Sequence, residues 1–342
     1  MKIAVVCGGL SNERDVSITS GTCVARALRE RGHKVLLIDL YYGYRGEYDD
    51  PASLYEKEQE DIKYSVSTET PDIEKLMADG NGSRIGSNVI EICKAADICF
   101  LALHGEDGEN GKLQATFDVH GIKYTGSGYL GSAIAMNKEI SKIMMRSSGI
   151  PVPEGIVLEK GGEIKNVGFP CVVKPCSGGS SVGTSMVADE SEYLTAIETA
   201  FKYEDHVLVE KFIKGRELTA GVMGKKAMPV IEIIPKEGWY DYKNKYQAGL
   251  TEEICPAPIS AEDTDRVQRL AERVREALMI DVYCRADFLM DETDGEIYCL
   301  EANTLPGMTP TSLVPQMARE MGMSFPQLCD KIIEVSMNKY DK

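Results

Sequence analysis

The first forty residues constrain the fold most, because they contain a strand, a helix and a second strand in succession. Residues 2–9 (KIAVVCGG) form an apolar run that ends in glycines, and residues 33–40 (HKVLLIDL) form another. The segment between them has apolar residues at helical spacing, with Ser17 or Thr19 as its expected N-cap and Gly32 as its expected end. Strands that are joined by a helix run parallel. The chain is therefore predicted to begin as a parallel α/β unit.

Later segments predict antiparallel strands instead. Residues 169–187 form a strand, a glycine-rich loop and a strand, and residues 282–303 form two strands around an Asp-Gly turn. Residues 207–224 contain two further strands around a turn, and residues 263–278 form an amphipathic helix. With 342 residues, the chain is long enough for two or three domains of mixed α/β class.

Two segments show no clean periodicity. Residues 41–90 mix tyrosines with acids and glycines, and we interpret them as an irregular excursion from the parallel sheet. Residues 237–258 are aromatic and charged, which predicts a long loop.

The composition excludes some partners and indicates a compartment. The net charge is −16, from 38 Lys and Arg against 54 Asp and Glu, which disfavours nucleic acids and anionic membranes because both need a basic face. No apolar run reaches the length of a membrane span, and the first residues turn polar too early for a secretory signal. The ten cysteines contain no C-x-x-C pair, so neither disulfides nor a cysteine-ligated metal site are expected. We therefore predict a cytoplasmic protein.

The hairpin at 282–303 carries the first group of chemically informative residues. Arg285 and Asp287 are two residues apart on one strand, and Glu301 and Asn303 are two apart on the other, so each pair lies on one face. Pairing the strands would bring three oxygen ligands and one cation together, which suits a hard divalent metal. A solvated sheet face with charge pairs across the strands explains the same pattern.

A glycine- and serine-rich loop carries the second group. Lys174 ends a strand, and the small residues 177–183 can let backbone N–H groups converge on an anion. The lysine precedes the glycines, unlike in a P-loop, so a loop that closes over phosphates fits better; an ordinary turn remains the alternative. Glu210, Lys211 and Glu217 follow at the next two strand ends, either as contacts to a nucleoside or as surface charges.

The loop after the first strand (GGLSNERDVS) carries a third candidate. It lacks the G-x-G-x-x-G pattern of dinucleotide-binding loops. Glu13, at the expected helix start, can instead meet a substrate ammonium. Among the four histidines, only His104 lies in a loop of comparable interest.

Taken in order, these segments resemble a known family. GGLSNERDVS, LHGEDGENGKLQ, YTGSGYLGSAIAMNK, VVKPCSGGSSVG, VEKFIKGRE, YDYKNKY, RADF and EANTLPGMTPTSLVP are similar to the motifs of the D-alanine–D-alanine ligases, members of the ATP-grasp superfamily. The resemblance implies an α/β (α+β ATP-grasp) fold with three domains. These are an N-terminal parallel α/β domain at 1–126, a central ATP-grasp domain at 127–215, and a C-terminal ATP-grasp domain at 216–342 with a lid at about 238–253.

The resemblance implies an ATP site and a metal site. Magnesium ligands would be Asp287, Glu301 and Asn303, for two Mg²⁺ ions, with Mn²⁺ as a possible substitute. The residues expected to contact ATP are Lys138, Lys174 and Lys245 on the phosphates, Glu210, Lys211, Glu217 and Trp239 around adenine and ribose, and Ser180.

It also implies two D-alanine sites. Glu13 would receive the ammonium of the first D-alanine, with Ser180 and Tyr246 as companions that tie the lid closed and with His104 nearby. Arg285 and the backbone N–H of Gly307 would form the oxyanion site. Ser312 and Leu313 would line the pocket of the second D-alanine.

The reaction implied is ATP-dependent formation of D-alanyl-D-alanine through a D-alanyl phosphate, for peptidoglycan precursor synthesis. The family also implies a homodimer. Tyr246 and Leu313 together favour D-alanine over D-lactate and D-serine as the second substrate. The alternatives are a D-alanine–D-serine ligase, another ATP-grasp carboxylate–amine ligase, and a nucleotide-binding regulatory protein that has lost catalysis.

Overall fold

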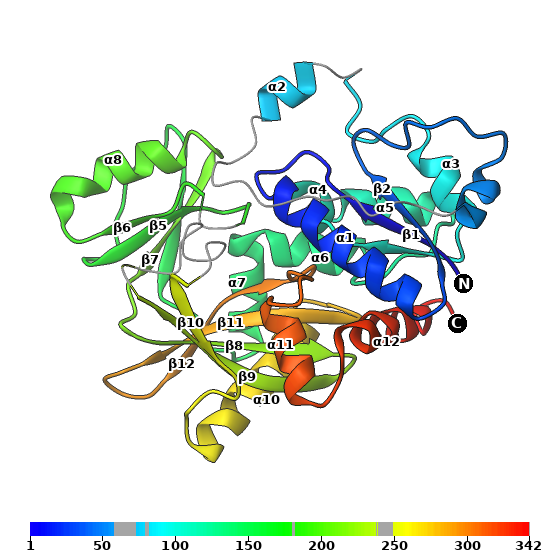
Figure 1. The fold of residues 1–342 in the computed structure, drawn as a ribbon. Coiled ribbons are helices and arrows are strands. Elements are labelled where there is room, and N and C mark those ends of the chain that lie inside the picture. Colours follow the sequence, from blue (N-terminus) through cyan, green and yellow to red (C-terminus); the bar gives the residue numbers. More distant parts are fainter. Residues whose placement is uncertain (58–72, 79–81, 180–181, 237, 239–248, 342) are drawn as a thin grey trace.

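The protein is built on three β-sheets, each with helices packed on it (Figure 1). The computed structural model describes residues 1–57, 73–78, 82–179, 182–236, 238 and 249–341. Within these residues, none of the helices is both long and apolar enough to cross a membrane. The predicted mixed α/β class, with one parallel sheet followed by antiparallel ones, is confirmed.

The first sheet is parallel and has the order β2-β1-β3. Its strands and their connecting helix are β1 (Lys2–Cys7), α1 (Arg14–Glu30), β2 (Lys34–Asp39) and β3 (Ile98–Leu101). All of β3 and most of β1 are buried, as a parallel sheet covered on both faces requires. The predicted strand–helix–strand unit is therefore correct.

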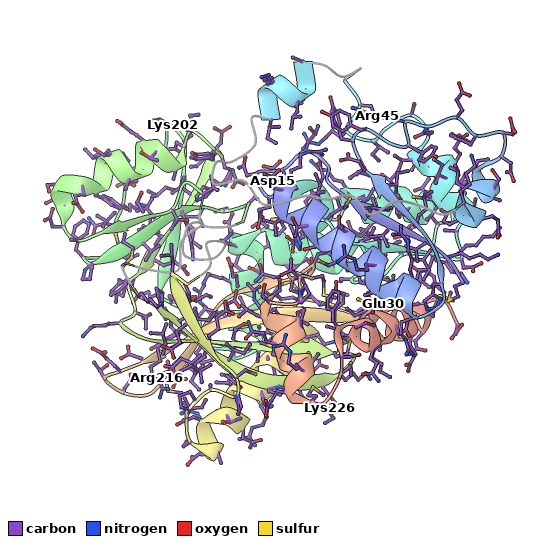
Figure 2. The ribbon with its side chains drawn as sticks, in the orientation of Figure 1. Asp15, Glu30, Arg45, Lys202, Arg216 and Lys226 are labelled. Atoms are coloured by element: carbon purple, nitrogen blue, oxygen red, sulfur yellow. The ribbon has the colours of Figure 1, made fainter. Side chains whose placement is uncertain are left out.

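The predicted N-cap of α1 is wrong. The helix begins at Arg14 with Glu13 as the N-cap residue, three residues before Ser17. The Ser17 hydroxyl is used elsewhere, because it accepts from the Gly8 N–H and donates to the Ala102 carbonyl, each at 2.8 Å. Ser17 thus joins the ends of β1 and β3. In Figure 2 the label of Asp15 marks the N-terminal end of α1, and the label of Glu30 marks the opposite end.

Two tyrosines of the irregular excursion at 41–90 bind the short helices that follow them in the chain. Tyr41 and Tyr55 are buried, and their hydroxyls donate to the carbonyls of Leu76 and Ile92, both at 2.9 Å. Local backbone groups are thereby satisfied without regular strands. The described elements here are η1 (Pro51–Glu56), α2 (Ile73–Ala78) and α3 (Val89–Lys94).

Four short helices lead from the first sheet to the second. Their bounds are α4 (Glu106–Glu109), α5 (Lys112–Val119), α6 (Tyr129–Met136) and α7 (Lys138–Ser147). Asn137 caps α7 by accepting from the Ile140 N–H, and Gly149 follows its end in a left-handed conformation.

The second sheet is antiparallel, has the order β4-β7-β5-β6, and is covered by α8 on one side (Figure 1). The hairpin predicted at 169–187 is present as β5 and β6. The bounds are β4 (Gly155–Glu159), β5 (Cys171–Pro175), β6 (Ser185–Val187), α8 (Glu190–Ala200) and β7 (His206–Lys211).

The third sheet is also antiparallel, with the order β10-β9-β8-β11-β12. Its elements are β8 (Gly215–Met223), β9 (Lys226–Pro235), β10 (Thr251–Ile254), α10 (Ala261–Ala277), β11 (Tyr283–Asp291) and β12 (Ile297–Asn303). They are followed by α11 (Leu313–Glu320) and α12 (Phe325–Met337), and α12 packs on α1. The two chain ends consequently lie near each other (Figure 1).

The observed strands differ from two of the predictions. The strands predicted at 207–224 form, but β7 and β8 belong to different sheets and do not pair with each other. The segment predicted as a long loop at 237–258 contains β10, because its residues 251–254 pair with β9 from Pro235 to Glu232.

The predicted domain boundaries remain a prediction. Residues of α6 and α7, such as Ala135 and Met145, share a core with the third sheet.

Candidate active site

A pocket of about 520 Å³ lies between the second and third sheets. Its size is that of ordinary small-molecule sites. Its lining includes strand residues of both sheets together with the glycine-rich loop. Seven of the predicted site residues line it: Lys138, Lys174, Glu210, Lys211, Glu217, Asp287 and Glu301.

The cationic part of the pocket is supplied by lysines from α7 and β5. Lys138 Nζ donates to the Gly178 carbonyl at 2.8 Å and lies 3.7 Å from a Glu301 carboxylate oxygen. Lys174 Nζ lies 2.6 Å from Glu210 Oε2. Burial alone would lower the pKa of Lys174, but the nearby Glu210 carboxylate raises it, so this lysine is charged at neutral pH.

The hairpin brings together the residues that were predicted to share one of its faces. Arg285 pairs with Asn303 and Asp287 with Glu301 across β11 and β12. Arg285 donates to both Asp287 oxygens at 2.8 Å, and Asn303 Nδ2 donates to Oδ2 at 2.9 Å. Thr219, which the sequence did not single out, donates to Asp287 Oδ1 at 2.7 Å. Two carboxylates and one amide on one face are a donor set that fits a hard divalent cation.

Because the third donor of this set is an amide, the set contains only two acidic ligands. Within the part of the chain that the structure describes, no group of three or more His, Cys, Asp or Glu residues is arranged to hold a metal. A phosphate-bearing partner would have to complete the coordination, as is usual for Mg²⁺.

The glycine-rich loop reaches the first sheet at Glu13. A Cβ atom added to Gly179 would lie 2.9 Å from Glu13 Oε2, and one added to Gly105 would lie 3.0 Å from the same oxygen. The backbone of both glycines therefore lies close to this buried carboxylate. The start of the loop is anchored by Glu204, whose carboxylate accepts from the Ser177 N–H at 2.5 Å and the Ser177 hydroxyl at 3.0 Å.

The segment after β12 carries the predicted oxyanion donor. Gly307 lies against Ser312, since an added Cβ would be 2.8 Å from Ser312 Oγ. Ser312 is the N-cap residue of α11, and its hydroxyl accepts from the Thr309 N–H at 3.1 Å. Leu313 is the buried first residue of the same helix.

His104 holds this segment to the first sheet. Its Nδ1 lies 3.0 Å from the Leu305 carbonyl and its Nε2 lies 2.9 Å from Ser20 Oγ, which in turn accepts from the Met308 N–H at 3.3 Å. Burial lowers the pKa of His104, so the neutral ring donates from Nδ1 and accepts at Nε2. His104 thereby fixes the backbone on both sides of Gly307.

Glu109, which sequence reasoning missed, supports the same segment. Its Oε1 accepts from the Leu305 N–H at 3.1 Å and its Oε2 from the Gly105 N–H at 2.9 Å. Burial, together with the charge of Glu13, raises the pKa of Glu109 to about 7. Its place in GEDGENG gave no signal, because only the fold brings residue 305 to it.

The raised pKa predicts a pH-dependent stability. Between the ordinary carboxyl pKa of 4.5 and about 7, the folded protein binds this proton and the unfolded chain does not, so stability falls as pH rises. The Glu109→Gln variant lacks the titrating carboxyl group, so this contribution to the pH dependence of its stability is absent. The difference in unfolding free energy, wild type minus variant, should decrease by about 2 to 3 kcal/mol from pH 5 to pH 8 in urea titrations. The exposed neighbour Glu106→Gln is the control, and parallel curves for wild type and Glu109→Gln would contradict the prediction.

Part of the predicted site lies outside the described residues. These positions are Ser180, Trp239, Lys245 and Tyr246, together with most of the lid at 238–253. Their predicted roles stay predictions.

Two family models match the chain. Residues 2–127 match the family model "D-ala D-ala ligase N-terminus" and residues 144–334 match "D-ala D-ala ligase C-terminus". A D-alanine–D-alanine ligase of Pediococcus pentosaceus is 44% identical, with 100% of this chain and 99% of the relative covered. One of Lacticaseibacillus casei is 42% identical, with 99% and 97% covered.

Solved structures give the same result. The D-alanine–D-alanine ligase of Bacillus anthracis complexed with ATP has a TM-score of 0.76 and 33% identity, covering 99% of this chain and 97% of its own. The VanG D-Ala:D-Ser ligase of Enterococcus faecalis has a TM-score of 0.75 and 30% identity, covering 98% and 99%. The chain belongs to the D-alanine–D-alanine ligase family.

Proposed function

We propose that this chain is an ATP-dependent ligase that joins two D-alanine molecules through a D-alanyl phosphate, for peptidoglycan precursor synthesis. Full-length relatives named D-alanine–D-alanine ligase, at 38–44% identity, bear this prediction out. The observation in the structure that supports it most is one pocket that joins the lysines of α7 and β5 to the acidic face of β11 and β12.

The first step needs a carboxylate to attack a phosphate. Glu13 would bind the ammonium of the first D-alanine, which directs its carboxylate into the pocket. Lys138 and Lys174 would hold the phosphates of ATP, since phosphoryl transfer depends mainly on positioning and on charge stabilisation. A carboxylate oxygen forms a bond to the γ-phosphorus as the bond to ADP breaks, which yields the acyl phosphate. Two Mg²⁺ ions on Asp287, Glu301 and Asn303 would neutralise phosphate charge.

The second step needs an oxyanion site. The neutral amine of the second D-alanine attacks the acyl carbon, and phosphate leaves as the tetrahedral intermediate collapses. Arg285 and the Gly307 N–H would stabilise the oxyanion, as pre-aimed donors do in other acyl transfers. The contacts of His104 and Glu109 to Leu305 support this role, because they immobilise the backbone next to Gly307. Exclusion of water by the lid would protect the acyl phosphate.

D-Alanine is the proposed second substrate, with Ser312 and Leu313 lining its pocket. Leu313 is apolar and buried, which suits a methyl group. D-Serine is the second candidate, because a relative of 30% identity over nearly the whole chain is named a D-Ala:D-Ser ligase.

A homodimer and a cytoplasmic location complete the proposal. The location is supported by the cysteines, all ten of which lie in the described residues and are free thiols, as is usual in a reducing compartment.

The test is phosphate release from Mg-ATP with a panel of amino acids. D-Alanine alone should stimulate it, and L-alanine should not. Addition of D-serine or D-lactate to D-alanine should leave D-alanyl-D-alanine as the main product by mass. A dominant D-alanyl-D-serine product would favour the second candidate. ATP binding without turnover under any amino acid would favour a regulatory protein, and turnover only with other amines a different carboxylate–amine ligase.

A further inference from the structure

The buried carboxylate of Glu210 faces two lysines. Lys142 Nζ lies 2.6 Å from Oε1 and Lys174 Nζ lies 2.6 Å from Oε2. The exposed fractions of the side chains are 3% for Glu210, 4% for Lys142 and 13% for Lys174. One negative and two positive charges are therefore held almost without water.

The two lysines differ in their access to the pocket. Lys174 lines it, and so does Glu210, whereas Lys142 does not. Lys142 lies on α7 one turn after Lys138, which does line the pocket, so the same helix face presents both residues at different depths. Lys142 therefore lies behind the wall of the pocket, and its contact with that wall is the ion pair with Glu210.

The two lysines also differ in the direction in which their surroundings shift the pKa. Burial lowers the pKa of Lys142, although Glu210 works against this effect. For Glu210, burial alone would raise the pKa, but Lys142 and Lys174 together lower it, so the carboxylate is charged. The charge of Glu301 also raises the pKa of Lys174, less strongly than that of Glu210.

A buried carboxylate with a single lysine would hold that lysine tightly, because breaking such a pair leaves an uncompensated charge in a medium of low dielectric constant. A second lysine beside the carboxylate removes this constraint, because the carboxylate keeps one cationic partner when the other lysine moves away. We propose that Lys142 is the permanent counterion of Glu210 and thereby allows Lys174 to turn from Glu210 to the phosphates of the nucleotide. Lys142 is then a positioning residue for nucleotide binding, an inference that rests on the proposed ATP-dependent function.

The experiment compares four variants with the wild type: Lys142→Met, Lys142→Arg, Glu210→Gln and the double variant Lys142→Met/Glu210→Gln. Calorimetry with the non-hydrolysable analogue AMP-PNP and Mg²⁺ gives Kd, and steady-state kinetics give KM for ATP and for D-alanine. Lys202→Met, which removes an exposed lysine beyond α8 (Figure 2), is the control for loss of one positive charge.

Lys142→Met should raise Kd for AMP-PNP and KM for ATP at least tenfold, with KM for D-alanine changed less than threefold, and Lys142→Arg should stay within about threefold of wild type. The decisive comparison is made in the Glu210→Gln background. Relative to Glu210→Gln alone, the double variant should have an unchanged or lower Kd. In this background Lys174 no longer faces a buried carboxylate, and Lys142→Met removes a positive charge near it.

Three results would overturn the inference. One is an unchanged Kd in Lys142→Met. Another is the same loss of affinity from Lys142→Met in both backgrounds, which is the result expected if Lys142 only packs α7. The third applies if Lys142→Met alone does not fold, as judged by circular dichroism. In that case, loss of AMP-PNP binding in both Lys142→Arg and the double variant would contradict the proposed role of Lys142. A wild type that binds no AMP-PNP and forms no dipeptide would instead refute the proposed function, and the inference with it.

Discussion

Replacing Glu301 with glutamine is expected to lower kcat/KM for ATP by about a thousandfold, which corresponds to about 4 kcal/mol of transition-state stabilisation. Glu301 faces Asp287 across β11 and β12 and lies at the pocket wall near Lys138. Loss of its charge removes half of the carboxylate pair that fits a divalent cation. The measurement is initial-rate kinetics of ADP formation with Mg²⁺ varied, where the variant should also require a higher Mg²⁺ concentration.

The control for Glu301 is Glu292→Gln. Glu292 lies in the turn of the same hairpin, where it forms an ion pair with Lys214 at 2.5 Å. This surface pair should contribute little, so its loss should leave kcat/KM within about twofold of the wild type. A Glu301→Gln enzyme with wild-type rates and Mg²⁺ dependence would show that the acidic face of the hairpin binds no metal.

Arg285→Lys is expected to lower kcat by about a hundredfold to a thousandfold, with a smaller change in KM for D-alanine. The planar guanidinium of Arg285 donates to both oxygens of Asp287, and a lysine ammonium cannot reproduce this fork. The charge remains in the variant but its position changes, so the loss reports on the placement of the proposed oxyanion donor. Rapid-quench measurement of a single turnover distinguishes slower chemistry from slower product release.

Arg269→Lys is the matched control, because Arg269 forms an exposed ion pair with Asp265 on α10 and lies outside the lining of the pocket. It should change neither kcat nor KM. If Arg285→Lys retains full single-turnover rates, then Arg285 serves only to hold Asp287, and the oxyanion must be stabilised by other donors.

Local patterns were sufficient to predict much of the fold and of the site. The alternation in β11 and β12 and the turn between them determine which residues are opposite each other, so Asp287, Glu301 and Asn303 were correctly placed together. The strand–loop–strand pattern at 169–187 likewise placed Lys174 before the glycine-rich loop. Both features depend on residues close in sequence.

Features that depend on distant segments were not predictable in this way. The start of α1 was misplaced because Ser17 bonds to Ala102, 85 residues away. β7 and β8 were not assigned to separate sheets, since a strand's partner depends on the edge that is available rather than on its own residues. Glu109 and Lys142 were missed for the same reason: their partners, Leu305 and Glu210, are brought to them only by the tertiary fold.

The central claim, ligation through D-alanyl phosphate, is tested most directly with D-alanine that carries ¹⁸O in both carboxylate oxygens. Incubation with Mg-ATP, followed by mass spectrometry of the products, follows the oxygen that bonds to phosphorus. The account predicts D-alanyl-D-alanine with three ¹⁸O atoms and one ¹⁸O atom in each inorganic phosphate released. Absence of the dipeptide, or a dipeptide formed with unlabelled phosphate, would contradict it.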